Sequence, residues 1–209
     1  MSIARIMQQA AAGGGGGGLN IGAAYGGGYY AGTFEQAGQQ YYLIVAPKSS
    51  GESSSKLWKT SNSGTSGTSS DIDGAANTSA MDNASHPAAQ FCAGLTIDGY
   101  SDWYMPARYE LELCYFNLKP TTANNSTSTG TNTYAVPPRT SNYTVSDPPQ
   151  TSAANFQSGG SEAFAATAYW TSTQLGTLFA YTRLFDSGSE SNNAKATSNY
   201  VRAVRREAI

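Results

Sequence analysis

The residues best suited to chemistry lie near the end of the sequence, where large side chains alternate along a predicted strand. In residues 178–185 (L-F-A-Y-T-R-L-F) every second residue is aromatic or basic. Because side chains alternate between the two faces of a strand, Phe179, Tyr181, Arg183 and Phe185 are predicted to share one face. Aromatic rings beside an arginine are typical of binding hot spots, so this set predicts molecular recognition. The alternative is an ordinary sheet face packed against loop residues.

A polar segment over residues 186–194 is predicted to be the connection after this strand. It adds Asp186, Glu190, Asn192 and Asn193 to the candidate binding site. The outward surface near residues 179–193 is therefore expected to recognise a partner more than the helix faces do.

Catalytic and metal chemistry find little support in the sequence. His86 is the only histidine, so a histidine-based zinc site or catalytic triad is excluded, and it is expected to be exposed at the start of a helix. Asp71 and Asp73 match part of an EF-hand loop, but no glutamate follows at its twelfth position. Cys92 and Cys114 are expected to be buried, reduced thiols. No catalytic residue, metal or cofactor is predicted.

Composition narrows the classes of partner. The 209 residues carry a formal net charge of −2 and only 12% charged residues, which excludes a basic face for nucleic acid. No apolar run approaches the ~20 residues that span a bilayer, so membrane insertion is not expected. The beginning of the sequence lacks the apolar core of a secretory signal, which favours synthesis in a cytoplasm. The 14 tyrosines suit either binding surfaces or a β-rich core.

The first residues are predicted to be an anchor. Residues 1–12 can form a short helix in which Ile3, Ile6 and Met7 lie on one apolar stripe. A helix this short needs a partner surface to be stable, and the six glycines that follow form a flexible tether. Residues 1–18 are therefore expected to join the protein to a larger assembly, with a disordered start as the alternative. Residues 19–209 are predicted to form one domain.

The predicted elements of this domain give an α+β fold with a small, mostly antiparallel sheet, two helices and long irregular loops. Residues 41–46 (Y-Y-L-I-V-A) form the clearest strand, and its continuous apolar run predicts burial on both faces. Apolar stripes predict helices over 84–94 and 107–118. An irregular strand is expected within 19–34 and a final strand over 198–205. Residues 49–80 and 121–160 are predicted to be loops.

Three sequence segments share one pattern. Residues 99–106 read G-Y-S-D-W-Y-M-P with Glu110 and Leu111 one turn later, residues 169–173 read Y-W-T-S-T, and residues 200–206 read Y-V-R-A-V-R-R. In this order they resemble the Lcl C-terminal-like domain, whose pattern is G-x-x-D-W-R-L-P-(T/S)-x-x-E-L, then Y-W-S-S-T, then Y-V-R-A-V-R. The chain departs from that pattern at Tyr104, Met105 and Ala107.

The resemblance implies a fold related to C-type lectins. It implies a structural role for Trp103 in the core, and for five further residues of the motifs, namely Tyr169, Trp170, Ser172, Val201 and Val204. Glu110 would reach back to the helix start or pair with an arginine such as Arg205. In related phage proteins of the major tropism determinant class, the last strands before the terminal arginine motif display the receptor-binding surface.

Because this domain is widespread in tailed-phage virion proteins, the resemblance implies a non-enzymatic virion structural protein of the tail, fibre or capsid surface. Its expected partners are other virion proteins, bound through the N-terminus, and a host-surface receptor or glycan. Assembly in the host cytoplasm and a homotrimer on the virion are expected. The alternatives are a brace that only stabilises the particle, or an enzyme like the formylglycine-generating oxidases. A bacterial surface adhesin would need a secretion signal.

Overall fold

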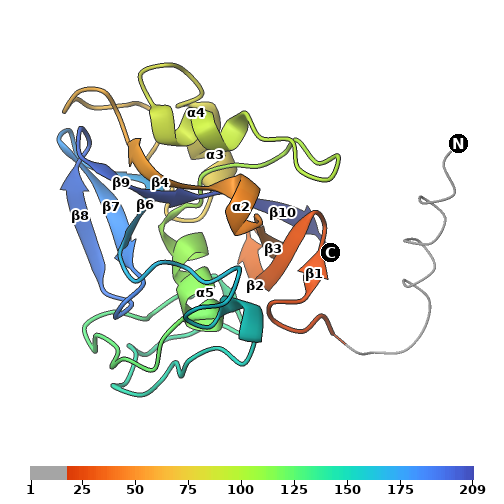
Figure 1. Cartoon of the computed structure of the whole chain (residues 1–209). Helices are drawn as coiled ribbons and strands as arrows, with labels where there is room; N and C mark the ends of the chain where they lie inside the picture. The colour runs from red at the N-terminus through yellow and green to blue at the C-terminus, as the bar shows by residue number, and fades with distance from the viewer. Residues whose placement is uncertain (1–17) are drawn as a thin grey trace, which may run out of the picture.

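The computed structural model describes residues 18–209, and in this range the chain is an α+β protein with two five-stranded sheets (Figure 1). All strand pairs are antiparallel except β6 with β9. The first sheet has the order β1-β2-β3-β10, with β5 also paired to β2, and the second has the order β4-β9-β6-β7-β8. The predicted α+β class is confirmed, with two sheets in place of one.

The strands are short and come from distant parts of the sequence. The first sheet contains β1 (Ala24–Tyr25), β2 (Gly28–Gln36), β3 (Gln39–Val45), β5 (Ala135–Val136) and β10 (Val204–Ala208). The second contains β4 (Glu52–Leu57), β6 (Ala168–Leu175), β7 (Phe179–Leu184), β8 (Glu190–Ala194) and β9 (Ser198–Arg202).

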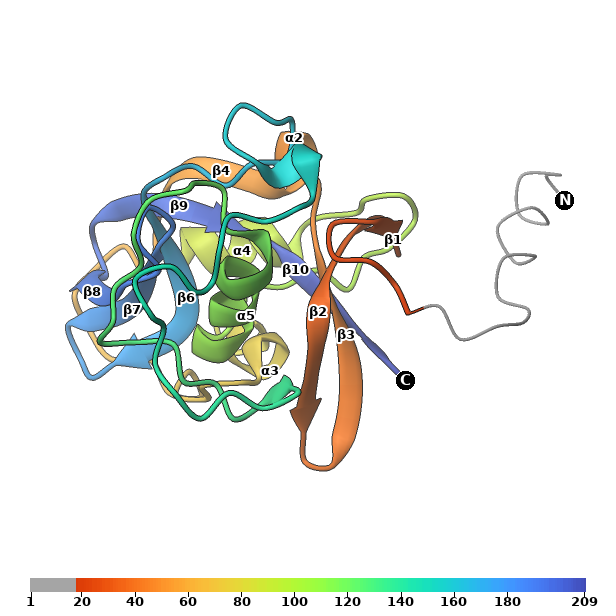
Figure 2. The same ribbon diagram turned by 90° about the horizontal axis from the view of Figure 1, so that it is seen from below.

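One helix lies between the two sheets. The helical elements are α2 (Lys48–Gly51), α3 (Gly74–Ser79), α4 (Pro87–Ala93), α5 (Arg108–Leu118) and the 3-10 turn η1 (Ala154–Phe156). Figures 1 and 2 both place α5 between β2 and the β6–β7 pair, and it contacts all three strands. The two predicted helices are thus confirmed as α4 and α5. In the described range no helix is both long and apolar enough to cross a bilayer.

The core has two parts, on opposite faces of the central strands. Along β3 and the residue after it, Leu43 and Val45 pack into the cluster that contains α5, whereas Ile44 and Ala46 pack into the cluster that contains α4. All four are fully buried, which confirms the prediction that this strand is covered on both faces. Burying one leucine or isoleucine side chain contributes about 1.5–3 kcal/mol.

The start of α5 is stabilised by a buried carboxylate. Ala107 precedes the helix and has no side chain that could cap it. Oε2 of Glu110 instead accepts the backbone N–H of Ala107 at 2.7 Å and that of Gly74 at 3.2 Å, and Oε1 accepts the hydroxyl of Tyr104 at 2.6 Å. Of the two roles expected for Glu110, the structure shows the one at the helix start, since Arg205 pairs with Asp102.

Four predictions about connections and exposure are wrong. Residues 49–80 are not one loop, because they contain β4 and α3, and residues 186–194 contain β8. The final strand is interrupted at Ala203, and its halves β9 and β10 belong to different sheets. His86 is buried, and each of its two ring nitrogens has a hydrogen-bond partner at 2.9 Å, Thr65 for Nε2 and Asn83 for Nδ1. Burial and the nearby lysines lower the pKa of His86 to about 4.

Candidate functional site

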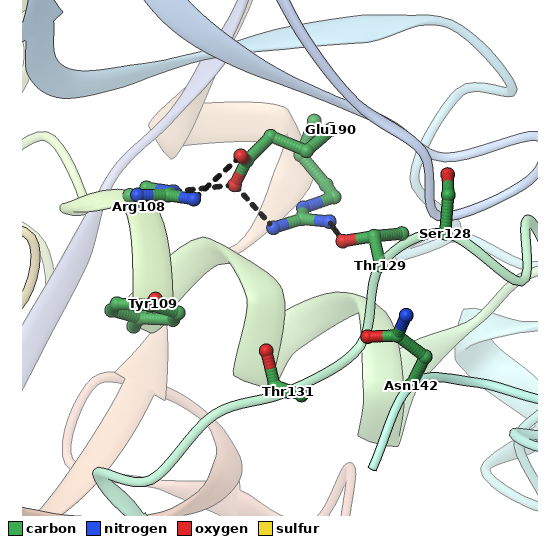
Figure 3. Close-up of a pocket in the computed structure, with 8 residues that line it drawn as sticks. Arg108, Tyr109, Ser128, Thr129, Thr131, Asn142 and Glu190 are labelled. Carbon is green, nitrogen blue, oxygen red and sulfur yellow. Dashed lines mark hydrogen bonds and ion pairs between the residues drawn. The ribbon is translucent and has the colours of Figure 1, made fainter. Parts of the chain in front are cut away.

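A polar pocket of about 190 Å³ opens where the start of α5, the β7–β8 pair and the long loop after α5 meet (Figure 3). All of its lining residues carry a side-chain hydrogen-bond donor or acceptor. They are Arg108, Tyr109, Ser128, Thr129, Thr131, Asn142, Arg183 and Glu190.

One carboxylate organises the base of this pocket. Glu190, the first residue of β8, accepts two hydrogen bonds from Arg108, from Nε at 2.6 Å and from Nη2 at 2.7 Å. It also accepts one from Nη2 of Arg183 at 3.2 Å. Bidentate pairs between arginine and carboxylate fix the geometry as well as the charge, so Glu190 holds both guanidinium groups in place.

The position of Arg108 follows from the local structure. It is the first residue of α5, and its backbone N–H donates to Oγ1 of Thr173 at 3.1 Å. Its guanidinium carbon lies 4.5 Å from the ring centroid of Tyr181 and 5.1 Å from that of Tyr109. Cation–π contacts of this kind restrain the arginine between two aromatic rings. Its Nη1 also lies 3.5 Å from a carboxylate oxygen of Asp71.

The opposite wall comes from the irregular segment after α5, and a second buried carboxylate holds this segment. Glu112 is fully buried and accepts hydrogen bonds from Asn132, Arg139 and Tyr143. Asn132 is next to Thr131 and Tyr143 is next to Asn142, the two residues that this segment brings to the pocket in Figure 3. The wall is therefore anchored to the helix and needs little ordering when a ligand binds.

A second pocket, of about 240 Å³, adjoins the first and shares Asn142 with it. Its lining residues are Phe116, Arg139, Thr140, Ser141, Asn142, Tyr143 and Asp147. The guanidinium of Arg139 lies over the ring of Phe116, with 3.8 Å between the guanidinium carbon and the ring centroid. The exposed residue Asn142 thus stands between two polar hollows of similar size.

The predicted row of outward-facing side chains on β7 is only partly present. Phe179 is 41% exposed, but Arg183 is 1% exposed and Phe185 is fully buried. The ring of Phe185 stacks on Phe164 with 4.0 Å between centroids, so its predicted exposure is wrong. Tyr181 is half-buried beneath Arg108. The face was expected to be open, but α5 and the 128–131 segment cover it at the Arg183 end.

The remaining predicted residues divide between the pocket and the free surface. Glu190 lies in the pocket, Asp186 and Asn192 are exposed, and Asn193 is half-buried, with its amide donating to Asn199 at 3.1 Å. The structure therefore brings Arg183 and Glu190 together with residues that the sequence did not indicate, chiefly Arg108, Tyr109 and Asn142.

The other residues considered for chemistry have structural contacts. Asp71 pairs with Arg108, and Asp73 caps α3 by accepting the N–H of Ala76 at 3.0 Å. Cys92 and Cys114 are free and fully buried, and burial raises the pKa of both thiols well above the usual value. A thiol held in this way is a poor nucleophile at neutral pH.

Comparisons with known proteins add no assignment. No protein-family model matches the chain, and no curated protein matches it. The geometry described above therefore carries the functional argument.

Proposed function

We propose that this protein is a virion structural protein of a tailed phage, with a lectin-like head that binds a host-surface ligand. The observation that carries recognition is the polar pocket at the start of α5, where two arginines, a shared glutamate and tyrosine rings meet on a preformed surface. Binding sites commonly combine a concave shape with a few fixed polar groups of this kind.

The contacts among the three motif segments support the proposed lectin-like scaffold. Tyr104 forms an isolated antiparallel bridge with Val204, which links the first segment to the last. Tyr169 pairs with Tyr200 in the parallel contact between β6 and β9, which links the second segment to the last. The backbone N–H of Ser172 donates to the carbonyl of Pro106 at 2.8 Å. Segments far apart in sequence thus form a single framework, as a shared domain signature requires.

The structure disfavours the alternative of a formylglycine-generating type of enzyme. That chemistry uses reactive cysteines, whereas Cys92 and Cys114 are buried in separate clusters of the core. A brace that only stabilises the particle is the other alternative, and it differs from a receptor binder in that it would not bind host cells.

Binding to host cells tests the recognition role. The full-length protein, fluorescently labelled, should bind host cells in a saturable way, and the double variant Thr131→Ala, Asn142→Ala should bind about tenfold more weakly or worse. Both residues are exposed, so their loss should leave the melting temperature unchanged. Asn124→Ala is the matched control, because Asn124 is exposed on the same segment and lines neither pocket. Equal binding by all variants would reject recognition through the pocket and favour the brace.

The proposed anchor over residues 1–18, with Ile3, Ile6 and Met7 as its apolar contacts, lies outside the described residues except for Gly18. Removing residues 1–18 should leave a folded head that no longer enters the particle. Replacing the three apolar residues by serine in the full chain should have the same effect. Light scattering of the intact protein tests the proposed trimer. Normal incorporation of either variant would refute the anchor.

A further inference from the structure

We infer that the two adjoining pockets are consecutive subsites for a neutral oligosaccharide, with Asn142 between the two sugar rings. The inference rests on the proposed function, because it names the ligand class and the length of ligand that the recognition surface takes. Three features of the structure carry it, namely the shared residue, the balance of charge and the rigidity of the wall.

The shared residue indicates a ligand longer than either pocket. Asn142 lines both hollows, and its exposed amide offers two donors and an acceptor at the point where they meet. The hollows have volumes of about 190 and 240 Å³, each smaller than the ~300–1,000 Å³ of pockets that hold a drug-sized ligand, so each suits one small unit of a chain. A chain of at least two rings would use both pockets, with the linkage beside Asn142.

The lining matches the chemistry of sugar hydroxyl groups. A hydroxyl both donates and accepts, and the pockets present groups of both kinds, from serine, threonine, asparagine and tyrosine side chains. Tyr109, half-buried at the edge of the first pocket, adds an aromatic surface on which the C–H face of a ring can pack. Apolar peptide side chains would find no comparable apolar surface in the first pocket.

The balance of charge favours a neutral ligand over an acidic one. Arg108 and Arg183 are paired with Glu190, and Arg108 also faces Asp71. In the second pocket Arg139 is paired with Glu112. Asp147 lines that pocket as well. The lining of the two pockets thus holds three arginines and two carboxylates, and two further carboxylates, Asp71 and the buried Glu112, pair with these arginines from outside the pockets. A sulfated or uronic acid chain would gain no net attraction here and would have to compete with carboxylates that already occupy the guanidinium groups.

The wall that carries Asn142 is held in place before binding. Tyr143, next to Asn142, donates to the buried carboxylate of Glu112, and Tyr143 is itself 4% exposed. Arg139, which also lines the second pocket, donates to the same carboxylate. Because the wall is already ordered in the free protein, ligand binding costs little conformational entropy there. This low cost favours the binding of a small uncharged chain.

Variants that block one subsite at a time provide the test. Ser128→Tyr fills only the first pocket and Ser141→Tyr only the second, and both positions are exposed. Titration calorimetry of the full-length protein would use neutral mono-, di- and trisaccharides that bind on a printed array, with uronic acid and sulfated chains of equal length beside them. Asn124→Tyr is the matched control outside both pockets.

The expected result is an affinity that rises at least tenfold from one ring to two and changes little with salt. Ser128→Tyr should abolish binding of all lengths, whereas Ser141→Tyr should remove only the gain from the second ring. Asn142→Ala should weaken the disaccharide about five- to tenfold, as the loss of one or two hydrogen bonds implies. The control should bind as the wild type does, and unchanged far-ultraviolet dichroism should show that each variant is folded.

Several results would overturn the inference. Binding that is independent of chain length would reject the two subsites, and a preference for acidic chains that declines with salt would reject neutrality. If the protein binds host cells through the Asn142 surface but no glycan on the array, the subsites are wrong and the proposed function stands. If it binds neither cells nor glycans, both proposals fail.

Discussion

Asp102 and Arg205, which lie 103 residues apart in sequence, form a two-pronged ion pair: Arg205 Nε donates to Oδ1 at 2.8 Å and Nη2 donates to Oδ2 at 3.0 Å. The guanidinium carbon also lies 4.1 Å from the ring centroid of Tyr100. This pair ties the segment before α5 to the last strand, beside the bridge between Tyr104 and Val204.

Asp102→Ala should therefore lower the free energy of unfolding by about 1–2 kcal/mol. The aspartate side chain is 53% exposed, which limits the gain from the charges, but its loss leaves the 7% exposed Arg205 without its bidentate partner. Urea unfolding would measure the change. Asp82→Ala is the control, because Asp82 is exposed and has no ion pair within residues 18–209. An equal effect of the two substitutions would contradict the role of this pair.

Arg183→Ala should destabilise the protein strongly, by about 3 kcal/mol, because it empties the space of a fully buried side chain, leaves the carbonyl of Gly188 without its donor and removes one of the two guanidinium partners of Glu190. Asn192→Ala, on the neighbouring edge strand, should change the stability by less than about 0.5 kcal/mol, since Asn192 is exposed. Chemical denaturation of both variants would check this contrast. A stability near that of the wild type for Arg183→Ala would show that the arginine serves binding and not the fold.

Glu110 should make stability depend on pH in the neutral range. Burial raises the pKa of Glu110 to about 7, and the hydrogen bonds from Tyr104 and Ala107 only partly oppose this rise. The folded state therefore binds the proton more tightly than the unfolded state does. The contribution to stability is complete below the unfolded pKa near 4.5 and is lost as the pH rises through about 7. The total change is about 3 kcal/mol if only this group titrates.

The variant Glu110→Gln tests this directly, because glutamine imitates the protonated acid. Its carbonyl can accept the N–H groups of Ala107 and Gly74, and its amide can donate to the oxygen of Tyr104. The free energy of unfolding, measured from pH 5 to pH 8, should depend less on pH for Glu110→Gln than for the wild type. The variant should be the more stable of the two at pH 8. Glu35→Gln, at an exposed position of β2, should keep the wild-type profile. Parallel profiles for all three proteins would refute the prediction.

Cys92 and Cys114 should react with iodoacetamide only when the protein unfolds. Both side chains are fully buried, and burial raises the pKa of each thiol. The native protein therefore has little reactive thiolate, and the reagent cannot reach it. Mass spectrometry of the native protein at pH 7.5 should find little labelling after a time that modifies the urea-unfolded protein completely. Rapid labelling of either cysteine in the native state would revive the enzyme alternative.

Local sequence patterns predicted those elements in which the apolar residues recur at the spacing of a helix or strand. The apolar run at 41–46 corresponds to β3, and the apolar stripe in 107–118 corresponds to α5. A strand buried on both faces needs a continuous apolar run, and a helix buried on one face needs an apolar stripe, so both can be recognised in the sequence. The strands β4 (E-S-S-S-K-L) and β8 (E-S-N-N-A) have no such pattern. Each is an edge strand with polar residues, and pairing with a neighbour creates it.

The candidate site was predicted only in part for a related reason. The alternation in 179–185 placed Tyr181 and Arg183 on one face. In the structure Tyr181 lies against Arg108, and Arg183 pairs with Glu190. What covers that face depends on Arg108, which is 82 residues from Glu190 in sequence, and on an irregular segment held by Glu112. Contacts over such distances follow from the fold as a whole, and no local spacing indicates them.

The interruption of the last strand at Ala203 has a consequence for how the protein is made. The N–H of Ala203 donates to the carbonyl of Gly51 and its carbonyl accepts from Ala46, so a single residue spans the junction between the two sheets. Since β9 alone joins β4 to β6, and β10 completes the other sheet, neither sheet is complete until residues 198–208 have been synthesised. A chain truncated before Ser198 should therefore remain sensitive to protease along β3 and β4, because cooperative folding needs both of these late strands.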